Sequence, residues 1–332
     1  MRSMPPRATV RRSAAWLVVL LVLAGAPQLF SVFRLELFTE VLIFALAAAS
    51  LDLLVGYAGL PSLGHAAFLG LGSYAAGLTA IHLTDSALVG LVVAMVAGAT
   101  FGVVTGALAV RTRGIYFLML TLAFGELLAS LSVTWVGLTG GTNGLAGIPA
   151  PRLPGFADDF LRQPTNRYFY VLAVVAVGFG LLHVVATSPF GRSLVGIREN
   201  EARMRSLGYP VDRFKLAAFV FAGMIAALAG ATAVQFSRFV SPEALSFKAS
   251  VFLLLMPLLG GAGRLWGAAV GALLVVFLRQ ELSSRFDGWE LGLGVLLLIV
   301  AYALPQLLAR TLRRSVRRPV GAGQPPEPEV SR

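Results

Sequence analysis

The chain of 332 residues is 57% hydrophobic and only 13% charged, and its mean hydropathy is +0.80. A soluble domain needs more polar surface than 13% charge supplies, and intrinsic disorder requires low hydrophobicity with high charge, so both classes are excluded. All but two of the 27 basic residues behind the net charge of +11 are arginine, and most lie between apolar segments or in the tails. This is the positive-inside pattern of a polytopic membrane protein, and it argues against nucleic-acid binding.

The apolar segments predict an all-α protein with about ten transmembrane helices, each needing about 20 residues to cross the hydrocarbon core. They cover residues 13–30, 39–56, 62–81, 87–110, 114–136, 168–187, 214–236, 249–262, 265–279 and 289–309. The first resembles a signal peptide, but Pro27 directly follows the small residues 24–26, which is a poor cleavage position, so we expect an uncleaved span.

The arrangement of charge predicts that both termini are cytoplasmic. Most of the arginines fall on the side that holds the N-terminal segment 1–12, the loop 188–213 and the tail 310–332, whereas the opposite loops also carry acids. The tail repeats arginine on one helical face, which is typical of an interfacial anchor, and its last residues are expected to be disordered. Residues 13–309 are then the membrane domain.

Three segments within the membrane domain interrupt simple spans or carry polar residues. Pro257 and the glycines at 260–263 divide the segment 249–279 into two short helices or a partly re-entrant element, and such breaks often lie near a transport path. Glu126 lies in the middle of an apolar run, where a carboxylate must face protein or water. It either lines a pathway or joins two helices by a hydrogen bond, whereas Asp52 and His65 are expected to be mainly structural, His65 as a buried neutral group.

Glycine spacing predicts close helix contacts and one exposed glycine-rich turn. Glycines recur at four-residue intervals at 98, 102 and 106, and again at 267 and 271, which favours tight packing between helices. The sequence TGGTNGLAG at 139–147 opens a long outer loop, and either an ordinary turn or a gate fits it equally well.

The loop 188–213 predicts a short amphipathic helix over residues 193–207. Ser188 with Pro189 is a helix start, Gly208 and Pro210 are stop signals, and apolar residues recur at helical spacing between them. By periodicity alone, this helix could lie on anionic lipid or dock into a groove of a soluble partner.

Several sequence blocks resemble one family of permeases. They are residues 56–68 (GYAGLPSLGHAAF), 111–117 (RTRGIYF), 139–145 (TGGTNGL), 239–244 (FVSPEA) and 260–267 (GGAGRLWG), together with RENEA at 198–202 and Leu207-Gly208. The last pair of blocks is similar to the Glu-Ala-Ala…Gly coupling loop of ABC importers. From about residue 40 to 309, the chain resembles the LivM-type permeases of branched-chain amino acid ABC importers.

The resemblance implies a transport subunit, not an enzyme, in a bacterial inner membrane. It implies a homologous second permease, two P-loop ATPase subunits that bind the ATP, and a periplasmic substrate-binding protein, with no cofactor in this chain. The implied coupling residues are Arg198, Glu199, Glu201, Ala202, Leu207 and Gly208. The candidate pathway or gate residues are His65, Glu126, Thr139, Gly140, Gly141 and Asn143.

Other functions fit the residues less well. The chain has no cysteine, only three widely separated histidines and no G-x-x-x-x-G-K-[ST] loop, so it has no thiolate or histidine metal pattern and no P-loop of its own. A permease for urea or short amides would have similar motifs. An ion-coupled secondary transporter with Asp52 or Glu126 as proton carrier would leave the loop 188–213 unexplained, and no catalytic constellation supports an intramembrane enzyme.

Overall fold

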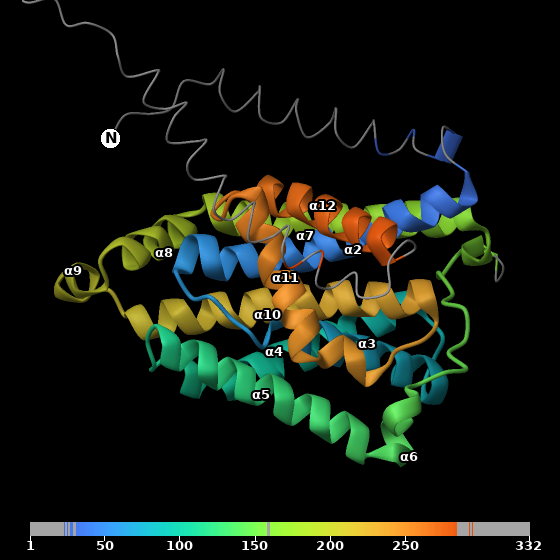
Figure 1. Cartoon of the computed structure of the whole chain (residues 1–332), viewed down its shortest axis with the longest axis horizontal. Helices are drawn as coiled ribbons and strands as arrows, with labels where there is room; N and C mark the ends of the chain where they lie inside the picture. Colours follow the sequence, from blue (N-terminus) through green and yellow to red (C-terminus); the bar gives the residue numbers. More distant parts are fainter. Residues whose placement is uncertain are drawn as a thin grey trace, which may run out of the picture. The chain divides into compact units, whose positions relative to one another are not determined.

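The computed structural model describes residues 31–157 and 160–283, together with residues 23, 25, 27, 28, 292 and 294 (Figure 1). The chain divides into two compact units, Met1–Gln280 and Glu281–Arg332, and almost every described helix lies in the first. The expected tail 310–332 lies outside the described residues, and so does nearly all of the expected spans 13–30 and 289–309.

Within the described ranges, six helices are long and apolar enough to cross a membrane, which confirms an all-helical polytopic membrane protein. They are α2 (Val32–Asp52) continued by the π-helical turn η1 (Leu53–Ala58), α4 (Ala87–Ala109), α5 (Ile115–Thr134), α7 (Pro164–Thr187), α10 (Val211–Ser237) and α12 (Leu265–Ser283). The shorter helices include α3 (His65–His82), α6 (Val136–Thr139), α8 (Pro189–Glu199), α9 (Glu201–Ser206) and α11 (Phe247–Gly260). The total of about ten spans and the cytoplasmic placement of both termini stay predictions.

The glycines of α4 allow this helix to pack closely on α10, as their spacing predicts. A Cβ atom on Gly98 would lie 2.6 Å from the Cβ of Ala227, and one on Gly106 would lie 2.8 Å from the ring of Phe219. Phe219 also stacks edge-on against Phe68 of α3, with ring centroids 5.4 Å apart. Helices α3, α4 and α10 therefore pack tightly against one another.

Helix α3 begins inside the bundle and not at its end. Residues 59–64 are non-helical, and Gly64 packs so closely on the Thr121 carbonyl of α5 that no side chain would fit there. The first turn of α3 then meets α11, because the Ala66 N–H donates to the Ser250 hydroxyl at 3.2 Å. Non-helical backbone at this depth is possible because protein surrounds it and satisfies its polar groups.

The segment 249–279 forms two helices that pack against each other. Gly260 of α11 contacts Gly267 of α12, and Met256 contacts Gly271 one turn further along, so the two helices run antiparallel. The close packing expected for Gly267 and Gly271 is confirmed. With 14 residues, α11 is about 21 Å long and cannot cross the whole hydrocarbon core.

The expected single helix over 193–207 is wrong, because the loop 188–213 contains two helices, α8 and α9. The break is at Asn200, whose backbone is extended (φ −156°) and whose Oδ1 accepts a hydrogen bond from the Arg203 N–H at 2.9 Å. An asparagine that caps a new helix competes with continuation of the old one. The helix start predicted at Ser188 is confirmed, since its hydroxyl accepts from the Gly191 N–H.

Candidate functional site

Helix α9 lies at one end of the bundle, beyond the ends of α7 and α10, and α6 lies at the opposite end (Figure 1). None of the six residues of α9 is buried. Among the predicted coupling residues, Arg198, Glu199, Ala202, Leu207 and Gly208 are exposed, and Leu207 has 67% of its surface accessible. Gly208 adopts a positive φ of 82°, which favours glycine at this turn. We call residues 199–209 the α9 tip.

The apolar ridge predicted along the loop is divided between two environments, so it can neither lie as one face on lipid nor dock as one face into a partner. Leu194 and Ile197 of α8 are almost fully buried in the chain's own core, whereas Leu207 is exposed. The break at Asn200 changes the direction of the chain, so the apolar residues of α8 and α9 cannot share one face. Only the exposed part of the ridge is available to another molecule.

Glu201 contacts three basic side chains, of which Lys215 and Arg113 lie outside the α9 tip and hold it to the bundle, whereas Arg205 belongs to α9 itself. Its carboxylate lies 2.8 Å from Lys215 Nζ, 3.0 Å from Arg205 Nη2 and 3.1 Å from Arg113 Nη2. Partial burial raises the pKa of Glu201, but the hydrogen bonds from Lys215 and Arg205 and the nearby charges outweigh it, so the pKa lies below its ordinary value. Arg205 also bridges to Asp212.

Two of the three partners of Glu201 could not be identified from the loop sequence, whereas Arg205 follows it at the i,i+4 spacing of a helix. Arg113 is 88 positions away along the chain, and Lys215 belongs to α10. The only available signal was that Arg113 lies in one of the resembling blocks, RTRGIYF.

His65 and Asp52 lie inside the protein, as the structural interpretation expects. His65 is fully buried, and its Nε2 lies 2.8 Å from the Ser50 hydroxyl. Asp52 is also fully buried, and its Oδ1 accepts from the Gly263 N–H at 2.7 Å. Both side chains join α2 to segments distant in sequence.

Glu126 lies near the middle of α5 on an exposed face. Its carboxylate accepts a hydrogen bond from the backbone N–H of Phe247, at 3.1 Å, in the first turn of α11. The contact fits a hydrogen-bonded link between helices, and the exposure leaves the same group accessible to a pathway. A carboxylate at this depth facing lipid would cost about 2.5–3.5 kcal/mol, so this face meets water or another protein.

The glycine-rich loop 139–147 forms a tight turn at the α6 end of the bundle. The Thr139 hydroxyl is 2.5 Å from the Ser132 carbonyl, and Gly140 and Gly141 both have positive φ angles. Leu145 then pairs with Val240 through two backbone hydrogen bonds of 2.8 and 3.2 Å. Thr139 and Gly141 are buried by this arrangement, whereas Asn143 is exposed.

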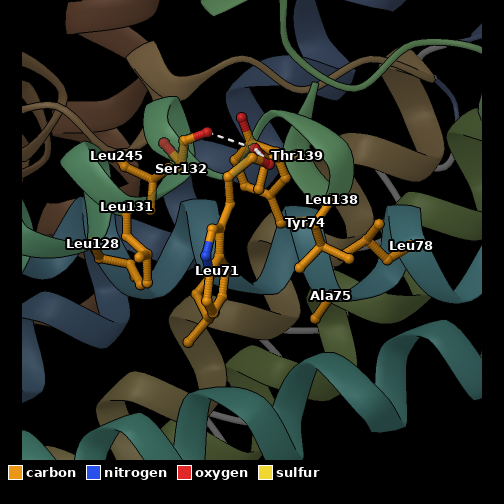
Figure 2. A pocket seen from close by; sticks show the side chains of 11 residues that line it. Leu71, Tyr74, Ala75, Leu78, Leu128, Leu131, Ser132, Leu138, Thr139 and Leu245 are labelled. Atoms are coloured by element: carbon orange, nitrogen blue, oxygen red, sulfur yellow. Dashed lines mark hydrogen bonds between the residues drawn. The ribbon is translucent and has the colours of Figure 1, made fainter. Parts of the chain in front are cut away.

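An apolar cavity of about 220 Å³ opens beside this turn, between α3, α5, α6 and the 3-10 turn Pro242–Leu245 (Figure 2). Its lining consists of Leu71, Tyr74, Ala75, Leu78, Leu128, Leu131, Ser132, Trp135, Leu138, Thr139 and Leu245. At its edge the Thr139 hydroxyl donates to the Ser132 carbonyl and the Ser132 hydroxyl donates to the Ala129 carbonyl, so the cavity presents mainly apolar surface. It suits an apolar group and not a charged one.

The described residues contain no group of three or more His, Cys, Asp or Glu side chains that could hold a metal ion.

Comparison with known proteins agrees with this description. The sequence profile of the family described as "Branched-chain amino acid transport system / permease component" matches residues 33–304. The chain is 31% identical to the high-affinity branched-chain amino acid transport system permease protein LivM of Escherichia coli K12, over 93% of this chain and 78% of the relative. It is 28% identical to the ribose import permease protein RbsC of the same organism, over 82% and 85% of the two chains. A probable LivM of Methanocaldococcus jannaschii is 23% identical over 76% and 82%. No solved structure matches.

Proposed function

Because the chain belongs to the family of branched-chain amino acid permease components of ABC importers, we propose that it translocates leucine, isoleucine, valine or a related small ligand across a bacterial inner membrane. Energy comes from separate ATPase subunits. The observation that supports this substrate class is the match to LivM, which is 31% identical over 93% of this chain. The ribose permease RbsC is 28% identical over 82% of this chain.

The α9 tip is the proposed docking site for an ATPase subunit. It projects from the bundle, contains no buried residue, and exposes Leu207 and Tyr209 beside the charged residues Glu199 and Arg203. An apolar centre with a polar surround is the usual composition of a protein interface. Glu201 is occupied by bases of its own chain, so its role is to hold the tip in place for docking.

The translocation path is proposed to run along the exposed face of α5. Only 22% of the residues in the apolar part of α5 are buried within the chain, and the exposed face of the helix carries Glu126 near its middle. A homologous second permease placed against α5 would enclose water beside Glu126 and remove the carboxylate from lipid. The turn at Thr139–Gly141 lies at the α6 end of the same helix, which is the position expected of an outer gate.

Purification of the tagged protein from native membranes in mild detergent tests this proposal. We expect mass spectrometry to find a P-loop ATPase and a second permease, and reconstituted vesicles to take up leucine or valine only when ATP is supplied together with the binding protein. Uptake of ribose or urea in preference to the branched-chain amino acids would overturn the substrate assignment. A homo-oligomer without an ATPase, whose uptake is abolished by a protonophore, would overturn the ABC mechanism.

A further inference from the structure

Arg198 links helix α8 to two interrupted parts of the membrane domain. One guanidinium nitrogen, Nη1, donates a hydrogen bond to the backbone carbonyl of Gly56, within the π-helical turn η1. The aliphatic part of the side chain lies against Gly59, where an added Cβ would be 2.7 Å from Arg198 Cγ. A Cβ on Gly263, in the turn between α11 and α12, would be 3.7 Å from Nη1.

Asp52 joins the same two parts directly. Its Oδ1 accepts from the Gly263 N–H at 2.7 Å, and the positive charge of Arg198 acts on its carboxylate. Gly56 packs so closely on the Gly263 backbone that a larger residue has no room at position 56. We call Asp52, Gly56, Gly263 and Arg198 the Arg198 joint.

The joint lies where movement of the loop would reach the membrane domain. Arg198 is the second-last residue of α8, directly before the α9 tip. The elements that it contacts are local breaks, a π-helical turn and a glycine turn, which change conformation more readily than continuous α-helix. A charge-assisted hydrogen bond is directional, so a shift of α8 must either carry η1 with it or break the bond.

On the premise of the proposed ABC function, we propose that Arg198 is a positioning residue that transmits displacement of the α9 tip to η1 and the α11–α12 turn. Although the residue is exposed, its guanidinium is engaged by the Gly56 carbonyl of its own chain. Loss of the guanidinium would separate ATP hydrolysis from transport while leaving ATPase docking intact, because the α9 tip keeps its own attachment through Glu201.

The test compares Arg198→Ala and Arg198→Lys with a control on the same helix. Arg192→Ala is the matched control, because Arg192 is exposed like Arg198 but its guanidinium donates to the Thr187 carbonyl at the end of α7, at 2.9 Å, and not to η1. Each variant is purified with its ATPase and second permease, placed in vesicles with the binding protein, and assayed for assembly, ATP hydrolysis and uptake. The wild-type complex first shows whether an ATPase is present, so failure of the proposed function is distinguished from failure of this inference.

We expect Arg198→Ala to retain the ATPase and its basal hydrolysis but to lower uptake about tenfold or more, which is the scale of one charge-assisted hydrogen bond. Arg198→Lys, which keeps a positive donor, should fall between Arg198→Ala and the wild type, and Arg192→Ala should match the wild type. Loss of the ATPase from Arg198→Ala, with a monodisperse permease, would make Arg198 a docking residue and overturn the proposal. Unchanged uptake per ATP hydrolysed by Arg198→Ala or, should that variant fail to fold, by Arg198→Lys would overturn it as well.

Discussion

Replacement of Glu201 by glutamine should lower the free energy that holds the α9 tip in place, and the exposure of its ion pairs indicates by how much. The substitution keeps the shape of the side chain but leaves Lys215, whose side chain is only 6% exposed, without its anionic partner. Removing one member of a buried ion pair costs about 3–5 kcal/mol, and exposed pairs contribute about 0–1 kcal/mol. Glu201 is 18% exposed and Arg113 is 68% exposed, so we expect a loss of about 2–3 kcal/mol, between the values for exposed and for buried pairs.

Hydrogen exchange measures this loss, because α9 is exposed and opens locally. Amides of residues 201–215 should exchange about 30- to 150-fold faster in Glu201→Gln, while amides of α3 and α10 beyond Lys215 stay unchanged. Adding Lys215→Met to Glu201→Gln removes the stranded charge and should restore most of the protection. Wild-type exchange rates in Glu201→Gln, within about threefold, would refute the claim that the ion pair holds the tip.

Four further changes test separate contacts. Lowering the pH below about 4.3, the pKa of an unperturbed Glu, should reduce the protection factors of the α9 amides, which compare their exchange with the intrinsic rate at the same pH. The pKa of Glu201 is lowered in the folded protein, so its stabilisation is lost as the pH falls through the folded value, and Glu201→Gln should lack this dependence. Asn200→Ala should cost α9 about 1 kcal/mol by removing its cap, measured by exchange of the same amides. Gly98→Leu should lower the melting temperature, since overpacking costs about 1–3 kcal/mol, whereas Gly180→Leu, where a Cβ meets nothing within 4 Å, should not. Glu126→Gln should retain more uptake than Glu126→Leu, because the amide oxygen still accepts from Phe247; equal and complete loss with normal folding would indicate that the ionised carboxylate is required.

The features that could be predicted from the sequence depend on regular periodicity or on helix-terminal signals. The apolar segments predicted five of the six described spans to within four residues, whereas α2 begins seven residues before the predicted start at 39. Ser188 marked the start of α8, and the four-residue glycine spacing in α4 marked a face for close packing, which the structure places on α10. These signals are local, because burial in lipid and close helix contact act on each helix as a unit.

The break at Asn200 and the orientation of Arg198 were missed for a common reason. Residues 193–207 have helical periodicity on both sides of Asn200, so a pattern of apolar positions cannot show whether the asparagine side chain caps a second helix. The direction of the Arg198 side chain depends on a carbonyl 142 positions earlier in the chain. Neither fact has a signature in the local sequence, because each depends on where the chain has already been placed by packing elsewhere.

The blocks that carry the family resemblance meet each other in space, and this explains their residue types. The block 56–68 contacts 260–267 where Gly56 packs on Gly263, 139–145 pairs with 239–244 through Leu145 and Val240, and the RTRGIYF block reaches the coupling loop through the Arg113–Glu201 bridge. At the first contact the Gly56 backbone lies too close to that of Gly263 for a Cβ atom at position 56. At the second, Gly144 adopts a positive φ and lies against the Val240 carbonyl. Both positions therefore require glycine on steric grounds. The three contacts join α9 to the turn between α4 and α5, η1 to the α11–α12 turn, and the α6 turn to the segment before α11. Each block is thus one half of a contact between two elements, and those elements must either move together or separate. The blocks therefore indicate transport only when they are considered as a set.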